Sequence, residues 1–208
     1  MEQKKRSVGA SERDEWLRAA WRVMVAGETG IDARRLVFVD ECGTHTSLAP
    51  LYGWAPKGQR ARLKVARNWG TNITLLASIT REGIGPSLAV EGATTREVFE
   101  AYLEHVLAPA LKPGRLVVMD NLSSHKGGRV KELIEGRGCE IMYLPPYSPD
   151  LNPIEQAFSK IKEILRRAEA RTREALIEAM GQALSAVTVA DSRGFFAHCG
   201  YRVMGQLL

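Results

Sequence analysis

The fold class is decided by residues 115 to 167, which read RLVVMDNLSSHKGGRVKELIEGRGCEIMYLPPYSPDLNPIEQAFSKIKEILRR. Apolar runs at 115–120 and 139–145 have the composition of buried strands, and 127–136 and 153–167 carry apolar residues at helical spacing. Strands that alternate with helices pair in parallel, because each helix carries the chain back to the start of the next strand. This half of the chain therefore predicts a parallel α/β arrangement.

The first half of the chain reads as a set of strands followed by one helix. LVFVD at 36–40 is a compact apolar run, RARLKVAR at 60–67 alternates apolar and basic residues, NITLLASIT at 72–80 is a third run, and 85–90 is a fourth. Helical spacing begins at Thr94, in a Thr-x-x-Glu capping pattern, and ends near Pro109. Successive strands of this kind form an antiparallel meander. The whole chain thus predicts an α/β fold with a mixed sheet flanked by helices.

The two ends of the chain predict helices that add to this sheet. SERDEWLRAAWRVMV at 11–25 places Trp16, Ala20, Val23 and Met24 at helical spacing behind a Ser11 cap. TREALIEAMGQALSAV and FFAHCGYRV, beyond residue 170, predict helical cover at the other end.

Composition excludes several classes of protein. The 208 residues are 45% hydrophobic and 25% charged, which suits one globular core. No apolar run reaches the ~20 residues of a membrane helix, and no apolar stretch follows the basic start, so we expect a cytosolic protein without membrane contact. Three cysteines without a Cys-x-x-Cys pair indicate buried thiols rather than disulfides or a zinc module.

Charge is unevenly distributed along the chain. The formal net charge is +5, and no acidic residue occurs between Glu41 and Glu82. That interval holds the basic residues Lys57, Arg60, Arg62, Lys64, Arg67 and Arg81. It therefore predicts a surface patch that suits a polyanion.

Two aspartates follow apolar strands and point to a metal site. Asp40 ends LVFVD and Asp120 ends LVVMD, so their carboxylates would meet at one edge of the sheet. Their repulsion is costly unless cations neutralise it, although each residue by itself is equally typical of a turn or a helix cap. Oxygen ligands without a Cys or His cluster favour Mg²⁺ or Mn²⁺.

Three further acids are less clear candidates. Glu41 would point to the opposite face of the strand from Asp40. Asp150, in S-P-D-L-N-P, suits either an Asx-type turn or a third ligand. Glu155 lies in the first turn of a helix, where the helix dipole alone would favour it. Pro145, Pro146, Pro149 and Pro153 stiffen the entrance to that helix, and Pro153 suits its first position.

These segments together resemble a known family. VDEC at 39–42, MDNLSSHK at 119–126 and YLPPYSPDLNPIEQAFSKIK at 143–162 resemble the catalytic domain of DDE transposases, in the branch of bacterial insertion sequences related to mariner elements. Asp120 and Glu155 are separated by 34 residues, the spacing that this family keeps between its second and third acids. YGWAPKGQ at 52–59 is also similar, and the resemblance covers roughly residues 35 to 170.

The resemblance implies a fold and a reaction. The fold is ribonuclease H-like, and Asp40, Asp120 and Glu155 are the catalytic residues that bind two Mg²⁺ or Mn²⁺ ions. The reaction is cleavage of DNA at transposon ends and strand transfer into target DNA, usually at a TA dinucleotide. The implied partners are transposon-end and target DNA, and further copies of the chain in a homodimer or a higher synaptic assembly.

Other residues receive supporting roles from the same resemblance. Asn121 and His125 would orient Asp120 or contact the scissile phosphate, unless they form a polar turn with the histidine facing solvent. The residues expected to bind DNA are Lys57, Arg60, Arg62, Lys64 and Lys126. Trp54 would lie beside a base, the alternative being a solvated sheet face with a core tryptophan.

The chain departs from the family at its N-terminal end. We expect residues 1–35 to be a helical linker remnant, 36–170 the catalytic domain, and 171–208 a C-terminal helical extension packed on that domain. About 35 residues are too few for the family's helix-turn-helix modules, so we expect an upstream DNA-binding polypeptide, a frameshifted segment or a truncated copy. The alternative function is a catalytically idle remnant that only binds DNA or dimerises. A flavodoxin-like phospho-receiver fits the strand-end acids but not the antiparallel half.

Overall fold

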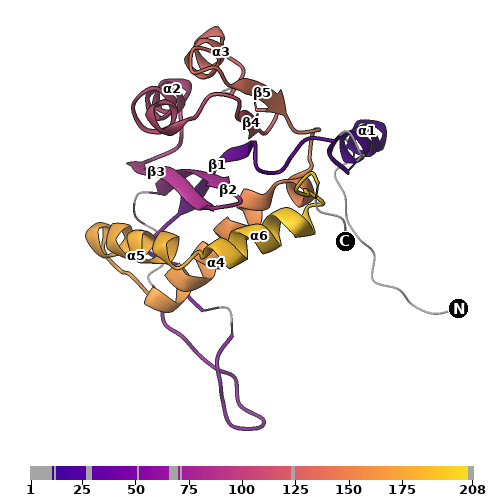
Figure 1. Ribbon diagram of the computed structural model, residues 1–208. Helices are drawn as coiled ribbons and strands as arrows, with labels where there is room; N and C mark the ends of the chain where they lie inside the picture. Colours follow the sequence, from indigo (N-terminus) through magenta and orange to yellow (C-terminus); the bar gives the residue numbers. More distant parts are fainter. Residues whose placement is uncertain are drawn as a thin grey trace, which may run out of the picture.

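The computed structural model describes residues 11, 13–26, 30–50, 52–65, 70, 72–122 and 125–205. Its centre is a five-stranded sheet with the order β3-β2-β1-β4-β5 (Figure 1). The strands are β1 (Leu36–Thr44), β2 (Ile73–Thr80), β3 (Gly83–Glu91), β4 (Leu116–Met119) and β5 (Glu140–Tyr143). β1, β2 and β3 pair antiparallel, whereas β4 pairs parallel with both β1 and β5. The predicted mixed sheet is confirmed.

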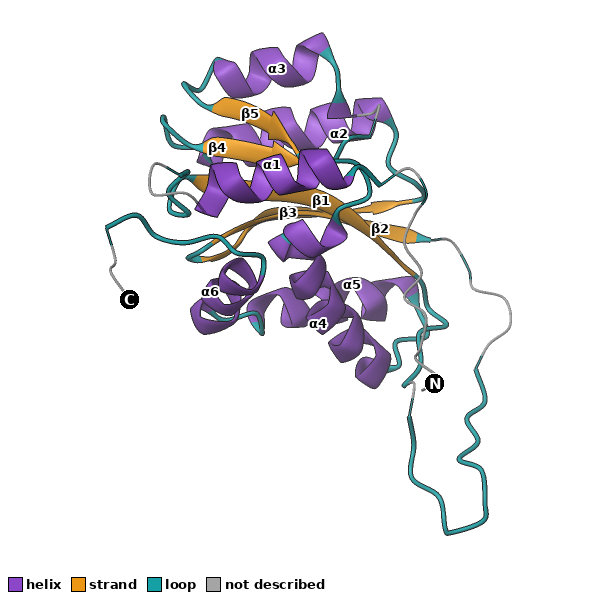
Figure 2. Ribbon diagram, turned by 90° about the vertical axis from the view of Figure 1, so that its right-hand side faces the viewer, coloured by secondary structure: helices purple, strands orange, loops and turns teal. Residues whose placement is uncertain are grey.

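Helices cover both faces of the sheet (Figures 1 and 2). One face carries α2 (Arg96–Tyr102), its continuations η1 (Leu103–Leu107) and η2 (Ala108–Ala110), and α3 (Gly128–Glu135). The other face carries α4 (Pro153–Ala168), α5 (Arg173–Ser185) and α6 (Val189–His198). A short 3-10 helix, η4 (Pro149–Leu151), precedes α4. The sheet is therefore the middle layer of three.

Strand alternation divides the core into two clusters. In β1, Phe38 and Cys42 belong to the cluster under α4, α5 and α6, whereas Val37 and Val39 belong to the cluster under α2 and α3. The three cysteines are free and buried, as predicted. The C-terminal segment packs on the same core as the sheet, where Phe196 and Tyr201 stand 5.4 and 5.0 Å from the ring of Phe38.

The predicted strand at 60–67 is wrong for residues 60–65, the part that the structure describes. Residues 52–65 form an exposed arm that extends away from the sheet and turns at Gly58, whose φ of +85° suits glycine (Figures 1 and 2). An alternating pattern makes a strand only where a neighbouring strand can pair with it. Leu63 and Val65 find no such neighbour in the described chain and stay partly exposed. Arg67 lies outside the described residues.

Helix α1 (Glu15–Ala26) forms where predicted but buries a different face. The backbone amides of Trp16 and Leu17 donate to Asp14 Oδ1, so Asp14 caps the helix in place of Ser11. The buried side chains are Arg18, Trp21 and Val25, whereas Trp16 is 76% exposed.

Long-range contacts explain the choice of face in α1. The Arg18 guanidinium bonds to Asp150, and the Trp21 indole Nε1 donates to the Tyr201 hydroxyl at 3.0 Å. Trp21 and Val25 also join the main core, so α1 packs against the sheet domain. No helix in the described parts of the chain is long and apolar enough to span a membrane.

Candidate active site

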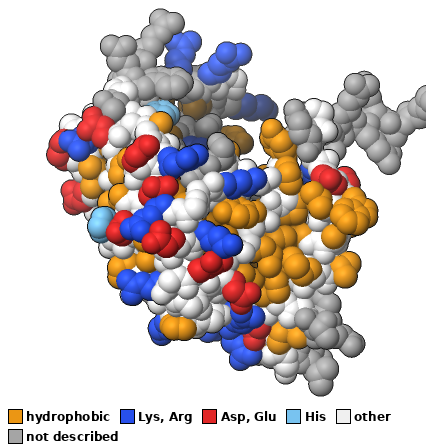
Figure 3. All heavy atoms as spheres, turned by 90° about the horizontal axis from the view of Figure 1, so that it is seen from above, with side chains coloured by type: hydrophobic (Ala, Val, Ile, Leu, Met, Phe, Trp, Pro, Cys, Tyr) orange, Lys and Arg blue, Asp and Glu red, His pale blue; other side chains and the backbone are white. Residues whose placement is uncertain are grey.

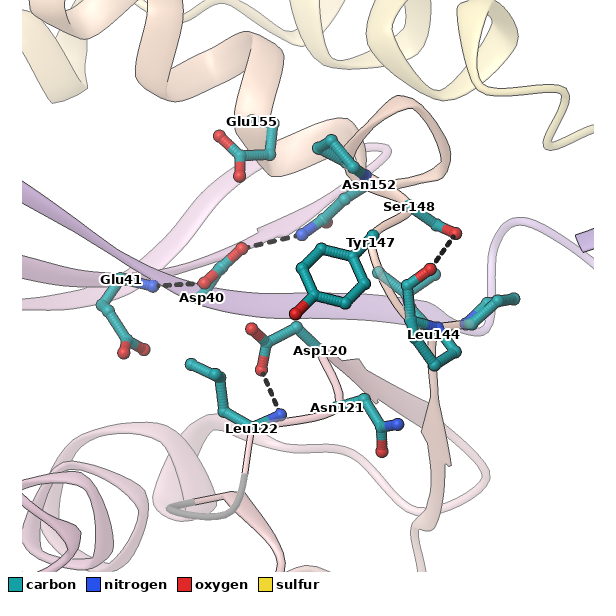
Figure 4. Close-up of a pocket in the computed structure, with 13 residues that line it drawn as sticks. Asp40, Glu41, Asp120, Asn121, Leu122, Leu144, Tyr147, Ser148, Asn152 and Glu155 are labelled. Atoms are coloured by element: carbon teal, nitrogen blue, oxygen red, sulfur yellow. Dashed lines mark hydrogen bonds between the residues drawn. The ribbon is translucent and has the colours of Figure 1, made fainter. Parts of the chain in front are cut away.

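A pocket of about 500 Å³ opens where β4 ends and α4 begins, beside the middle of β1, which continues past Asp40 to Thr44 (Figure 4). All three predicted acids, Asp40, Asp120 and Glu155, line it. Asn121 lines it as well, whereas His125 lies behind Asp120, buried in the protein. Parallel pairing of Val39 with Met119 places Asp40 and Asp120 at the same level of the sheet. The fold thus brings together acids that are far apart in the sequence.

Asp40 is held by two hydrogen bonds. The Asn152 Nδ2 group donates to Oδ2 at 2.8 Å, and the backbone amide of Glu41 donates to Oδ1 at 2.8 Å (Figure 4). Burial raises the pKa of Asp40 to about 7. The hydrogen bond from the Glu41 amide lowers this pKa, whereas the charges of Asp120 and Glu155 add to the rise. The pocket therefore holds more negative charge than its protein neighbours compensate.

Asp120 is held by a histidine that is fully buried. His125 Nδ1 lies 2.5 Å from Asp120 Oδ1, and the backbone amide of Leu122 donates to the same oxygen at 3.1 Å. The ring of His125 stacks on Phe99 at 4.1 Å between centroids. The alternative of a solvent-facing histidine is therefore wrong.

Glu41 completes a line of three side chains, Asp120, His125 and Glu41, of which the two acids line the pocket and His125 lies behind it. Alternation directs it to the face opposite Asp40, as predicted, and there its Oε2 lies 3.1 Å from His125 Nε2. Burial lowers the pKa of His125, but the bonds to Asp120 and Glu41 outweigh that effect and raise it to about 9. At neutral pH the imidazolium donates to both carboxylates.

Glu155 reaches the pocket from the first turn of α4. The helix begins at Pro153, as predicted, which sets the position of Glu155 in that turn. Partial desolvation by the pocket walls raises the pKa of Glu155, the cation of Lys162 opposes the rise, and the charge of Asp120 adds to it. Lys162 lies two turns further along α4, so its side chain is on the same face of the helix as Glu155.

The loop before α4 is held from both ends of the chain. Arg18 donates to both oxygens of Asp150, at 2.9 and 2.6 Å, and the Tyr201 hydroxyl donates to the Leu151 carbonyl at 2.7 Å. Asp150 is thus an ion-pair partner rather than a turn former or a ligand, and Arg18 holds the pKa of its carboxyl below the usual value. The loop is fixed on the side away from the pocket.

The sequence did not predict two contacts of the site: the bond from Asn152 to Asp40 and the contact of Glu41 with His125. Asn152 stands at the N-cap of α4, where its side chain would be expected to cap the helix, but it makes no capping bond and turns to Asp40 instead. The only feature of the sequence that singles out Asn152 is its position directly before Pro153, the first residue of α4. The contact of Glu41 with His125 spans 84 positions, which no local pattern records.

The donor set fits a hard divalent cation. Carboxylate oxygens are the ligands that Mg²⁺ and Mn²⁺ prefer, and the pKa of Asp40 is raised by burial first and by the charges of the neighbouring acids second. As the side chains stand, no three His, Cys, Asp or Glu residues in the described chain are close enough to hold one ion. Asp120 is drawn toward His125 and Asp40 toward Asn152, so a bound ion would require these carboxylates to turn inward.

The predicted DNA-binding residues lie outside the pocket. Lys57, Arg60, Arg62 and Lys64 are exposed on the arm, together with a fully exposed Trp54. The alternative of a core tryptophan in a sheet is therefore wrong. Lys126 is also exposed, with its Nζ 5.8 Å from the centre of the Tyr143 ring.

The model of one protein family, described as DDE superfamily endonuclease, matches residues 35–177. The chain belongs to this family. The Tcb1 transposase of Caenorhabditis briggsae is 28% identical over 121 residues, which cover 56% of this chain and 43% of that protein. The chain thus spans less than half the length of this curated relative.

Solved structures show the same fold. The Mos1 transposase paired-end complex with left transposon end matches with a TM-score of 0.77 at 18% identity, covering 96% of this chain and 64% of that one. The catalytic domain of Mos1 mariner transposase matches with a TM-score of 0.66 at 14% identity, covering 93% and 91%. The ribonuclease H-like fold is therefore confirmed, and a phospho-receiver fold is excluded by the antiparallel β1, β2 and β3.

Proposed function

We propose that this chain is a transposase catalytic domain that cuts DNA at transposon ends and transfers the cut strands to target DNA. Asp40, Asp120 and Glu155 would be its catalytic carboxylates. The observation that carries the proposal is the convergence of these three acids, from two parallel strands and one helix, on a single pocket. The transposases of the related transposable elements support the same reaction.

The cofactor would be Mg²⁺ or Mn²⁺, with two ions held by Asp40, Asp120 and Glu155. Mos1 paired-end complexes have been solved with Mg and with Mn, which supports this choice. When bound, such ions lower the pKa of a water or 3′-hydroxyl nucleophile and stabilise the leaving oxygen of an in-line displacement.

The residues around the acids would keep them ready for ligands. Asn152 and the Glu41 amide fix the plane of the Asp40 carboxylate. The charged His125 holds Asp120 and offsets part of the acidic charge. Such outer contacts orient metal ligands, and their loss commonly costs about 10- to 100-fold in metal affinity or activity.

DNA would reach the pocket along exposed basic residues. Lys57, Arg60, Arg62 and Lys64 on the arm, and Lys126 beside the pocket, would contact phosphates, and Trp54 would lie against a base. The paired-end complexes of Mos1 support a homodimer or higher synaptic assembly. An upstream DNA-binding polypeptide would recognise the transposon ends.

A cleavage and strand-transfer assay tests the proposal. DNA carrying the element's ends is incubated with Mg²⁺ or Mn²⁺ and with wild-type chain, Asp120→Asn or Glu155→Gln. We expect products from wild type and none above background from the two variants. Equal activity of all three would refute the proposed carboxylate chemistry. If wild type is inactive, adding the upstream DNA-binding segment separates an incomplete enzyme from an idle remnant.

A further inference from the structure

The backbone of Tyr147 has an unusual conformation at the edge of the pocket. Its φ is +50°, and Glu169 is the other described non-glycine residue with positive φ. Glu169 ends α4, where a left-handed residue is ordinary. Tyr147 ends no helix, and a bulky side chain in this region costs free energy that glycine would avoid.

Folding alone does not account for this cost. The Tyr147 ring is 57% exposed, so the strained backbone does not serve to bury it. The loop around it is fixed, since Ser148 Oγ donates to the Pro146 carbonyl at 3.1 Å and the Leu144 amide donates to the Met119 carbonyl at 2.9 Å. Strain that persists under such constraints gathers at functional sites.

The ring projects into the proposed active site. Tyr147 lines the same pocket as the three acids, and Figure 4 shows its ring among Asp40, Asp120 and Asn152. The residues just before it in the chain that line the same pocket, Leu144, Pro145 and Pro146, are apolar. The pocket therefore has one acidic wall and one apolar, aromatic wall.

A second cavity continues from the apolar wall. It has a volume of about 360 Å³, shares Asn121, Leu144, Pro145 and Pro146 with the first pocket, and is otherwise lined by Tyr143 and by residues of α1. The residues of α1 that line it are Leu17, Ala20, Trp21 and Met24. In Figure 3 apolar side chains gather on the right of the molecule, the side on which Figure 1 places α1.

Taken with the proposed function, this arrangement matches a nucleotide. A phosphate belongs at the acidic wall with its cations, and the base attached to the neighbouring sugar would then meet the apolar wall. A base within a duplex presents only its edges, so an aromatic ring can stack on it only when it is unpaired and turned out.

We propose that Tyr147 stacks, inside the pocket that holds the three acids, on an unpaired nucleobase next to the scissile phosphate. The proposal rests on the proposed function, because it takes a DNA phosphate as the group bound at the acids. The strained backbone holds the ring in place before DNA binds. Tyr147 is then a substrate-binding residue, and its ring face, not its hydroxyl, makes the contact.

Single abasic sites in the DNA test this contact directly. Cleavage is measured for wild type, Tyr147→Phe and Tyr147→Ala on DNA that lacks one base at each position near the cut. We expect Tyr147→Ala to lose about 5- to 100-fold in kcat/KM, as stacking on one base implies, and Tyr147→Phe to keep wild-type activity. At one position the abasic site should lower wild-type cleavage but leave Tyr147→Ala unchanged.

Two controls separate binding from folding and from chemistry. Tyr147→Gly relieves the positive φ, so its Tm should equal or exceed that of wild type while its cleavage falls like that of Tyr147→Ala. In the Glu155→Gln background, 2-aminopurine at the contacted position should change fluorescence on binding only when Tyr147 is present.

Several results would overturn the inference. Additive effects of Tyr147→Ala and the abasic site at every position would exclude a contact with a base. Equal losses in Tyr147→Phe and Tyr147→Ala would assign the role to the hydroxyl, and a fall in Tm of Tyr147→Gly would make the ring structural. If wild type cleaves no DNA even with the upstream DNA-binding segment supplied, the proposed function fails, and an unchanged 2-aminopurine signal then removes the base contact too.

Discussion

Replacing Asp150 with Asn removes the counter-ion of the fully buried Arg18 while keeping the size of the side chain. Arg18 would retain only the carboxylate of Glu15, at 3.4 Å. Breaking a buried ion pair by removing one partner costs about 3–5 kcal/mol, and the 46% exposure of the Asp150 side chain reduces this. We therefore expect Asp150→Asn to lower the free energy of unfolding by about 2–3 kcal/mol.

The pH dependence of unfolding gives a second reading of the same pair. Arg18 lowers the pKa of folded Asp150, so the pair stabilises the protein above the unfolded pKa, near 4, and this contribution is lost as the pH falls toward the folded value. Urea unfolding of wild type and Asp150→Asn between pH 7 and pH 3 measures both effects. The difference between the two proteins should shrink as the pH falls.

An exposed pair provides the matched control. Glu163 and Arg167 are one turn apart on α4, and both side chains are largely exposed, so Glu163→Gln should cost no more than about 0.5 kcal/mol. The double variant Arg18→Met, Asp150→Asn should lose less than the sum of the two single variants, because neither partner is left unpaired. Additive losses, or equal losses in Asp150→Asn and Glu163→Gln, would refute the reasoning.

Three further predictions concern the pocket and the arm. Burial raises the pKa of Asp40 to about 7, so without divalent ions its contribution to stability is lost as the pH rises from about 4 through 7. Asp40→Asn should therefore raise the free energy of unfolding at pH 8 by roughly 2–4 kcal/mol. An unchanged free energy of unfolding would show that ionised Asp40 does not destabilise the fold. Asn152→Ala removes a bond to a charged group, and calorimetry with Mn²⁺ should show about 10- to 100-fold weaker binding, whereas equal affinity would mean that Asn152 does not position Asp40. Changing Arg60 and Arg62 on the arm to Gln should reduce the slope of log affinity against log salt by about 0.9 for each phosphate that the arm no longer neutralises, and an unchanged slope would exclude binding of the arm to DNA.

The acids of the pocket could be predicted because their positions depend on local patterns. An apolar run followed by an acid records a buried strand, and Asp120 directly follows the end of β4, whereas β1 continues through Asp40 to Thr44, so only the side of the sheet and not the strand end was predicted there. Pro153 likewise marks the first residue of α4, from which the place of Glu155 follows. Each of these features is visible in a stretch of a few neighbouring residues, so the sequence alone could predict it.

The features that could not be predicted depend on distant residues. α1 has apolar residues on every side, and the buried face is chosen by Asp150, which lies 132 positions from Arg18. The alternation in residues 60–65 was genuine, but a strand also requires a partner, which a single segment does not reveal. The Asn152 bond to Asp40 spans 112 positions, so its role appears only once the sheet is assembled.

The hydrogen bond from Tyr201 to the loop before α4 bears on when the enzyme is completed during its synthesis. Tyr201 is among the last residues that the structure describes, whereas Asp40, Asp120 and Glu155 are all made earlier. A chain that stops before residue 201 has every acid, but its loop lacks the Tyr201 hydroxyl and the link to Trp21. If the proposed function holds, we therefore expect chains that stop before residue 201 to cut DNA poorly.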